Sequence, residues 1–267
     1  IRTYFYWQDY VTEGGNAGRS YMNSERAVGF SLSTTVQDGK VYFSILSYDK
    51  SAAYAKIAAT TAAPNADTVL ATGENAVLRI NMKWAGNKLT VSATSVADES
   101  KTTGDAVFDL TDKTAILDAV KEPAGFAFVL SSGVDADASS SVGHIAYKDL
   151  TAATPVLTEV ALTKGAFKNS SRFYMYDNNA WNSSTGNTVF SCDGEYFTSM
   201  PSAMNNLYNA ENKAAVLQYR QAMKGDYELS YQWKLNKANA DTIRTYFYWQ
   251  DYVTEGGNAG RSYMNSE

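Results

Sequence analysis

The stretch IRTYFYWQDY at residues 1–10 has the alternation that decides the fold class of this chain. Successive side chains of a β-strand point to opposite faces, so an extended stretch of this kind has two faces. One face, suited to a core, consists of Ile1, Thr3, Phe5 and Trp7. The other, named here the tyrosine face, consists of Arg2, Tyr4, Tyr6, Gln8 and Tyr10. The alternation therefore predicts a strand that is buried on one side and amphipathic on the other.

The same stretch opens a long duplication. IRTYFYWQDYVTEGGNAGRSYMNSE fills residues 1–25 and returns letter for letter at residues 243–267, an offset of 242 residues. Two diverged domains would not be identical here and unlike elsewhere, so we interpret the chain as slightly more than one period of a tandem array. A deliberate duplication of one end, as in a circular permutant or a swapped assembly, is the competing explanation. A period of 242 residues suits one large β-domain.

Strand and turn signals recur along the rest of the chain. Residues 37–40 (QDGK) and 85–87 (AGN) are turn signals between alternating runs, and Asp-Gly in such a place is a strong hairpin signal. Tyr227–Leu235 alternates throughout its length, and residues 126–130 and 144–150 are shorter strand candidates. The pattern predicts an all-β fold of antiparallel strands in two sheets.

The boundary between units is predicted near Pro155 rather than at the duplicated ends. Residues 151–158 (TAATPVLT) combine small and hydroxyl residues with one of the chain's four prolines, directly after a predicted strand. We therefore expect residues 1–154 to be the rear part of one unit and residues 155–267 the front part of the next. The two copies, 1–10 and 243–252, would then occupy equivalent places in successive units.

The composition limits the class of protein. Hydrophobic residues make up 45% and charged residues 19%, with 19 Tyr, 11 Phe and 5 Trp, which favours β-structure with hydroxyl-rich faces. The net charge of −5 and the lack of a basic run argue against nucleic acid as a partner. No apolar run of about 18 residues occurs, so we expect no membrane insertion. The single Cys192 is interpreted as a small buried hydrophobe.

Read from residue 155 onward and continued through residues 1–154, the unit resembles the concanavalin A-like jelly-roll superfamily of L-type lectins, laminin-G modules and related glucanases. Each likeness is a short motif, and together they cover about three quarters of a unit. The matching segments are residues 241–248 (DTIRTYFY), 14–18 (GGNAG) with 27–31 (AVGFS), 77–84 with 88–92, and 125–128 (GFAF) with 142–145 (VGHI). The resemblance implies one jelly-roll sandwich of two antiparallel sheets for each 242-residue repeat.

The departures from this superfamily bear on function. Its lectin calcium loop follows a strand end rich in acids, whereas residues 30–35 (FSLSTT) contain none, so a lectin-type calcium site is not supported. Asp135 and Asp137 lie in an acidic, hydroxyl-rich loop and are weak calcium candidates, more simply read as a solvated loop. Asp241 matches the place of the lectin sugar-binding aspartate, and anchoring a loop is an equally good reading.

Catalytic patterns are weak. Glucanases of this fold need closely spaced carboxylates on one strand, and the nearest candidates, Asp98-Glu99 and Asp193-Gly194-Glu195, read as polar loop residues. His144 is the only histidine, which excludes histidine-based metal clusters and argues against the usual Ser–His–Asp catalysis. We therefore predict that the protein is not an enzyme and needs no cofactor.

Two functions remain. The first is a non-catalytic unit of an extracellular or cell-surface stalk, adhesin or filament, bacterial in origin, whose partners are neighbouring copies of the same repeat. The alternative is a lectin-like module that binds glycans through the tyrosine face, since sugars stack on aromatic rings and hydrogen-bond to planar polar groups. On the first reading the same tyrosines pack against neighbouring strands or the next unit. A glycosidase would be a third class and would need a close carboxylate pair in a cleft.

Overall fold

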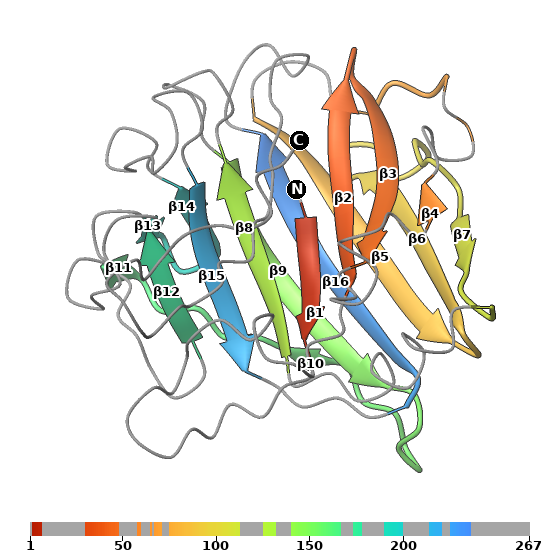
Figure 1. The fold of residues 1–267 in the computed structure, drawn as a ribbon. Helices are drawn as coiled ribbons and strands as arrows, with labels where there is room; N and C mark the ends of the chain where they lie inside the picture. The colour runs from red at the N-terminus through yellow and green to blue at the C-terminus, as the bar shows by residue number, and fades with distance from the viewer. Residues whose placement is uncertain are drawn as a thin grey trace, which may run out of the picture.

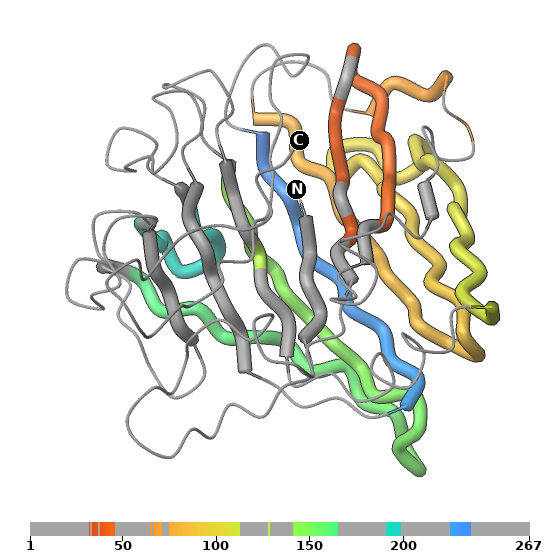
Figure 2. The backbone as a smooth tube through the Cα atoms, viewed as in Figure 1, coloured from red at the N-terminus to blue at the C-terminus, as the bar shows by residue number. Residues whose placement is uncertain are grey.

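The computed structural model describes twelve parts of the chain. Figure 2 shows the course of the backbone as a smooth tube. They are residues 2–6, 30–47, 58–59, 65, 67–70, 75–112, 125–131, 140–166, 173–177, 190–199, 214–220 and 225–235. Gln8, Tyr10, Asp135, Asp137, Asp241 and the whole second copy, 243–267, lie outside these residues. All regular secondary structure within these residues is β-strand, and all strand pairing is antiparallel, which confirms the predicted all-β class (Figure 1).

The strands form two sheets. The seven-stranded sheet has the order β12 (Phe173–Asp177), β15 (Ala214–Arg220), β8 (Gly125–Ser131), β1 (Arg2–Tyr6), β2 (Phe30–Gln37), β3 (Lys40–Ser47) and β4 (Ala58–Ala59). The nine-stranded sheet has the order β11 (Gly165–Ala166), β13 (Phe190–Cys192), β14 (Tyr196–Ser199), β9 (Ser140–Asp149), β16 (Tyr227–Leu235), β5 (Ala76–Ala85), β6 (Lys88–Ser95) and β7 (Ala106–Asp109). Its ninth strand, β10 (Thr158–Glu159), pairs with β9.

Both predicted hairpins are present, and the residues of their turns account for the tight connection between the paired strands. Asp38 and Gly39 join β2 to β3 with φ angles of 50° and 72°, and Gly86 and Asn87 join β5 to β6 with 55° and 66°. Two central residues with positive φ define the type I′ turn, whose twist matches that of the flanking strands. Glycine, aspartate and asparagine tolerate this conformation best, so the local sequence dictates both turns.

Strand β16 lies in the middle of the nine-stranded sheet, between β5 and β9. Its side chains alternate between buried and half-buried along all nine residues, as the sequence predicted. The buried set is Tyr227, Leu229, Tyr231, Trp233 and Leu235. The ring of Tyr231 packs edge-on against Phe128 of β8, with the two centroids 4.9 Å apart, so the core side of one sheet meets the core side of the other.

Strand β1 is central in the seven-stranded sheet. It pairs with β8 along five residues and with β2 along four. Thr3 is aligned with Leu32 and with Phe128, whose side chains are fully buried, whereas Tyr4 is aligned with Ser31 and Ala127. The structure thus confirms a strand at residues 2–6, whereas which face of this strand is buried stays a prediction.

Strands from both sides of Pro155 belong to the same two sheets. In the nine-stranded sheet β16 pairs with β5 and β9, and in the seven-stranded sheet β15 pairs with β8. Directly after Pro155, the chain turns back so that Thr158 pairs with Tyr147. The division into a rear part, 1–154, and a front part, 155–267, of successive units stays a prediction. Cys192 is buried and free, as the sequence indicated.

Trp233 provides a test of this packing. Replacing this fully buried side chain by alanine leaves a large cavity, so we expect Trp233→Ala to lower the free energy of unfolding by about 3–5 kcal/mol. Trp233→Phe should cost clearly less, because it keeps a ring and removes an indole N–H that is buried without a hydrogen-bond partner. Urea denaturation measures both, with Val107→Ala at an exposed position as the control. Equal losses for the two Trp233 variants would contradict this account.

Candidate functional site

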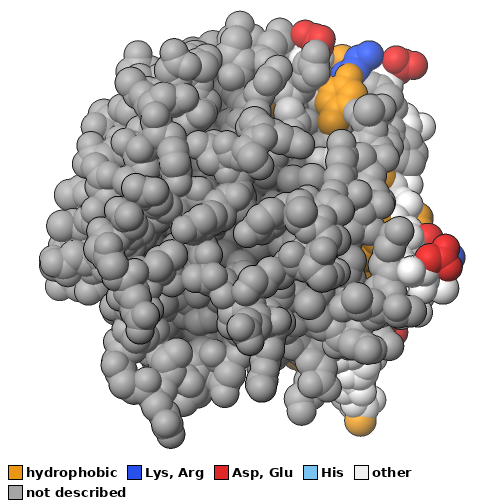
Figure 3. Space-filling model, viewed as in Figure 1, with side chains coloured by type: hydrophobic (Ala, Val, Ile, Leu, Met, Phe, Trp, Pro, Cys, Tyr) orange, Lys and Arg blue, Asp and Glu red, His pale blue; other side chains and the backbone are white. Residues whose placement is uncertain are grey.

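The outer side of the nine-stranded sheet is a polar surface. On its central strands, polar side chains alternate with the buried ones and are half-buried or exposed. This surface, named here the polar face, includes Arg79, Asn81, Lys83, Thr90, Ser92, Thr94, Glu228, Ser230, Gln232 and Lys234. In the view of Figure 3, the described residues lie mainly along one edge of the molecule, and they include charged side chains of both signs.

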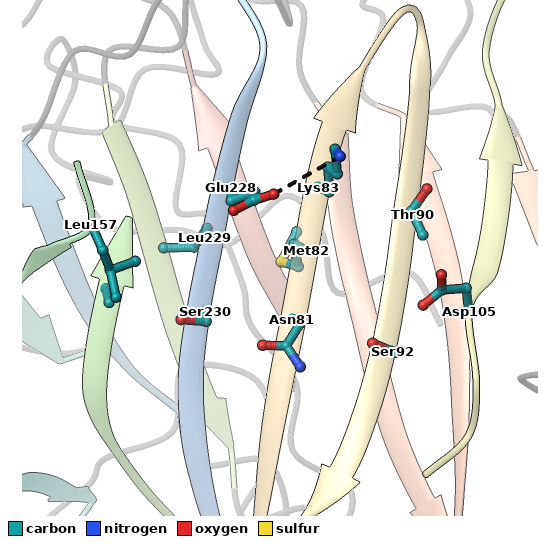
Figure 4. A pocket seen from close by; sticks show the side chains of 11 residues that line it. Asn81, Met82, Lys83, Thr90, Ser92, Asp105, Leu157, Glu228, Leu229 and Ser230 are labelled. Carbon is teal, nitrogen blue, oxygen red and sulfur yellow. Dashed lines mark ion pairs between the residues drawn. The ribbon is translucent and has the colours of Figure 1, made fainter. Parts of the chain in front are cut away.

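A first hollow of about 370 Å³ lies on the polar face over β5, β6 and β16 (Figure 4). Asn81 and Ser230 lie on neighbouring strands in it, and Leu157 stands at one side, with an exposed fraction of 56%. Glu228 lies between two lysines, 4.0 Å from Lys83 Nζ and 3.9 Å from Lys148 Nζ. Such solvated ion pairs add little stability, so the charges remain available to a polar partner.

A second hollow of about 450 Å³ lies between the end of β10 and the start of β14, which pair with the same edge of β9. Its lining includes His144, Glu159 and Glu195, together with the apolar residues 145 and 160–162 and Gly194. It is therefore a notch in the sheet edge with two carboxylates and an imidazole on its walls.

His144 lies in a β-bulge of β9 and lines the second hollow. Ser230 pairs with Ala146 while Gln232 pairs with Gly143, so two residues of β9 stand opposite the single residue Tyr231. His144 has a φ of 46°, in the left-handed region that histidine enters more readily than most residues. Bulges bend a strand and redirect a side chain. As a result the only histidine of the chain is exposed.

Beside the notch lies a group of residues named here the Tyr196 cluster, formed by Tyr196, Gly143, His144, Gln232 and Lys234. The Tyr196 hydroxyl donates a hydrogen bond to Gln232 Oε1 across Gly143, which pairs with both residues. The His144 ring meets the Tyr196 ring edge-on at 5.0 Å, and Lys234 Nζ lies 5.9 Å from its centroid.

Gly143 is what makes this crossing possible. A Cβ at this position would overlap the Glu195 carbonyl oxygen and lie 2.7 Å from Tyr196 Cδ1. The missing side chain lets β14 approach β9 and lets the Tyr196 ring lie over the backbone of β9 toward Gln232. Burial, followed by the charges of Glu195 and Asp193, raises the pKa of Tyr196, so the hydroxyl stays protonated and remains a donor.

Two of the carboxylates named from the sequence, Asp98 and Asp193, are turn residues. Asp193 accepts hydrogen bonds from the backbone N–H groups of Tyr196 at 2.7 Å and of Glu195 at 2.8 Å, which lower its pKa. Asp98 accepts the Ser100 hydroxyl at 2.6 Å and its backbone N–H at 3.2 Å, and these bonds lower the pKa of Asp98. Both carboxylates hold turns in shape, as expected for polar loop residues.

The residues predicted as sites fall into two groups, those on β1 and those outside the described residues. Arg2, Tyr4 and Tyr6 lie on β1 in the seven-stranded sheet, apart from the polar face of the other sheet. Gln8, Tyr10 and Asp241 lie outside the described residues, as do Asp135 and Asp137. In the part of the chain that the structure describes, no group of three or more His, Cys, Asp or Glu side chains is placed to hold a metal ion.

The Tyr196 cluster cannot be recognised from the sequence alone. Gln232 and Lys234 lie on the polar side of the alternating stretch Tyr227–Leu235, which the sequence does reveal. Tyr196 of β14 and Gln232 of β16 are distant in sequence. They meet because both residues pair with Gly143 of β9, which lies between the two strands. The cluster offers a ring, an amide and an ammonium group, a combination suited to recognition of a polar ligand.

Searches of the chain against protein-family models and against curated proteins find no match. Among the described residues, no helix has the length and apolar character needed to cross a membrane.

Gly143→Ala tests how the cluster is built. We expect a loss of about 1–3 kcal/mol in the free energy of unfolding, because the new methyl group forces β14 away from β9. Gly86→Ala is the matched control, since a Cβ there meets no atom within 4 Å and only the positive φ is strained. Urea denaturation of both variants gives the comparison. A loss for Gly143→Ala no larger than that for Gly86→Ala would show that the close approach is unimportant.

Proposed function

We propose that this chain is a window on a tandem array of 242-residue, non-catalytic units that forms a bacterial cell-surface stalk, adhesin or filament. The observation that carries the proposal is the identity of residues 1–25 with residues 243–267. Arrays of stacked units set the length of an assembly, and neighbouring units stabilise one another. The natural partners of each unit are therefore its neighbours.

Each unit is proposed to be a concanavalin A-like jelly roll. Two antiparallel sheets, the two type I′ hairpins and the contact between Phe128 and Tyr231 are compatible with this architecture. The duplicated segment matters to such a unit because it supplies β1, a central strand. A repeat of this segment at a constant offset is thus a repeat of a structurally required element.

The mass of the intact protein from its natural source tests the array. We expect a value far above the 29.2 kDa of this sequence, in steps that reflect additional 242-residue units. Mass spectrometry of the purified protein, or of its large proteolytic fragments, gives the value directly. An intact mass close to 29.2 kDa would overturn the array and favour a deliberate duplication of one end.

A second candidate is glycan binding, and the Tyr196 cluster favours it. A ring backed by an amide and an ammonium group beside a polar notch matches how proteins hold sugars, by stacking and by hydrogen bonds to hydroxyl groups. The tyrosine face of residues 1–10 offers similar chemistry on the other sheet. An adhesive array would gain from such a surface, because each repeat adds another weak site.

Binding to a glycan array separates the candidates. If the polar face binds glycans, Tyr196→Ala should abolish binding, while Tyr196→Phe keeps the ring and should weaken it by a smaller factor. If the tyrosine face binds instead, the variant with Tyr4→Ala and Tyr6→Ala loses binding. Asp112→Ala, at an exposed position beyond β7, is the control for a surface change. No binding of the wild-type chain to any glycan would leave the structural role alone.

A further inference from the structure

The register of the nine-stranded sheet places small side chains in one line across four strands. Asn81 of β5 is opposite Ser92 of β6 on one side and Ser230 of β16 on the other, and Ser230 is opposite Ala146 of β9. All four residues line the first hollow. Since paired strands lie about 4.8 Å apart, the line is about 14 Å long and runs across the strands. The part of the hollow above this line is named here the transverse groove.

Longer side chains stand on both sides of this line. Residues on the same face of a strand are two positions apart, so the register also sets the neighbouring rows. One row contains Lys83, Glu228 and Lys148, and the row on the other side contains Arg79 and Gln232. The transverse groove therefore has a floor of small side chains between two rows of long polar ones.

The two ends of the groove differ in chemistry. Figure 4 shows Asp105 at the end beside β6 and β7, and Leu157 at the opposite end. Lys148 belongs to β9, at the end where Leu157 lies. In its row two ammonium groups face the single carboxylate of Glu228, at 4.0 and 3.9 Å. A further carboxylate is therefore favoured near Lys148 and repelled by Asp105 at the other end.

An extended peptide matches this groove. Each peptide residue other than proline presents one N–H donor and one C=O acceptor, and the Asn81 amide and the two serine hydroxyls on the floor supply groups of both kinds. At about 3.3 Å per residue, four or five residues cover the length of about 14 Å. A glycan fits this hollow less well, because sugars stack on aromatic rings and none of the described residues that line it is aromatic.

We propose that the transverse groove binds an extended peptide segment of a partner protein, with an acidic side chain near Lys148 and an apolar side chain against Leu157. The carboxylate selects the peptide, because charges at the rim of an interface determine specificity and association rate. The apolar side chain covers Leu157, which is otherwise 56% exposed. The inference depends neither on the array nor on glycan binding at the Tyr196 cluster.

A panel of four synthetic peptides tests the proposal. The parent peptide is acetyl-Ser-Thr-Ser-Thr-Glu-Leu-amide, and in the other three Gln replaces Glu, Ser replaces Leu, or both changes are made. Titration into the full-length chain, followed by NMR of the peptide signals, gives the dissociation constants without a label. We expect the parent to bind most tightly, and each single replacement to weaken binding by about three- to tenfold, because one removes the carboxylate and the other the apolar contact.

Variants of the full-length chain assign the binding to the groove. Ser230→Trp places a large ring on the centre of the floor and should abolish binding. Lys148→Glu should weaken binding of the two peptides that contain Glu by about five- to tenfold and leave the two Gln peptides unchanged. The matched control is Lys164→Glu, the same charge change at an exposed position between β10 and β11, which should change nothing. Urea denaturation shows that each variant is folded.

Four results would overturn the proposal. In the first, no peptide of the panel binds the wild-type chain. In the second, all four bind equally, so that neither side chain is recognised. In the third, the parent peptide binds Ser230→Trp and Lys148→Glu as well as it binds the wild type, so that it occupies another surface. In the fourth, the wild-type chain binds a glycan rather than the peptides and Ser230→Trp loses that binding, which would assign the groove to sugars. None of these results bears on whether the natural protein is an array.

Discussion

The continuity of the seven-stranded sheet depends on the double backbone pairing of β1. Among the described strands, only these five residues join β8 to β2, and each edge of β1 supplies a ladder that no side chain can replace. Because Thr3 is aligned with Leu32 and Phe128, the same strand also sets the register of two buried positions. A short segment thus controls both the sheet and part of the core, and it is the segment that the sequence repeats.

The core that β1 helps to align is built mainly by β16 and β5 in the opposite sheet. Trp233 and Trp84 are fully buried there, and Tyr227 is buried so deeply that desolvation raises the pKa of its hydroxyl. The Phe128–Tyr231 contact links the two layers directly. Strands from before and after Pro155 share this core, so the fold is held together by pairings between residues far apart in the sequence.

The polar face is a consequence of the same alternation. Burying every second residue of β5, β6 and β16 leaves the intervening polar side chains on the outside of the nine-stranded sheet. One irregularity, the bulge at His144 beside Gly143, turns part of this regular surface into a distinct group of side chains. A ring, an amide and a cation meet there because one strand bends and one residue lacks a side chain. Recognition chemistry is thereby concentrated at the least regular point of the sheet.

The all-β class, the two hairpins and the buried face of Tyr227–Leu235 can be predicted from the sequence, because the period of two and the turn residues are local properties of the chain. The sequence likewise shows that the segment containing β1 occurs twice. The three-dimensional fold was needed to show that β16 lies between β5 and β9, that β1 lies between β8 and β2, and that Tyr196 reaches Gln232 over Gly143. These choices depend on pairings between distant strands, and alternation alone does not specify which strand edges meet.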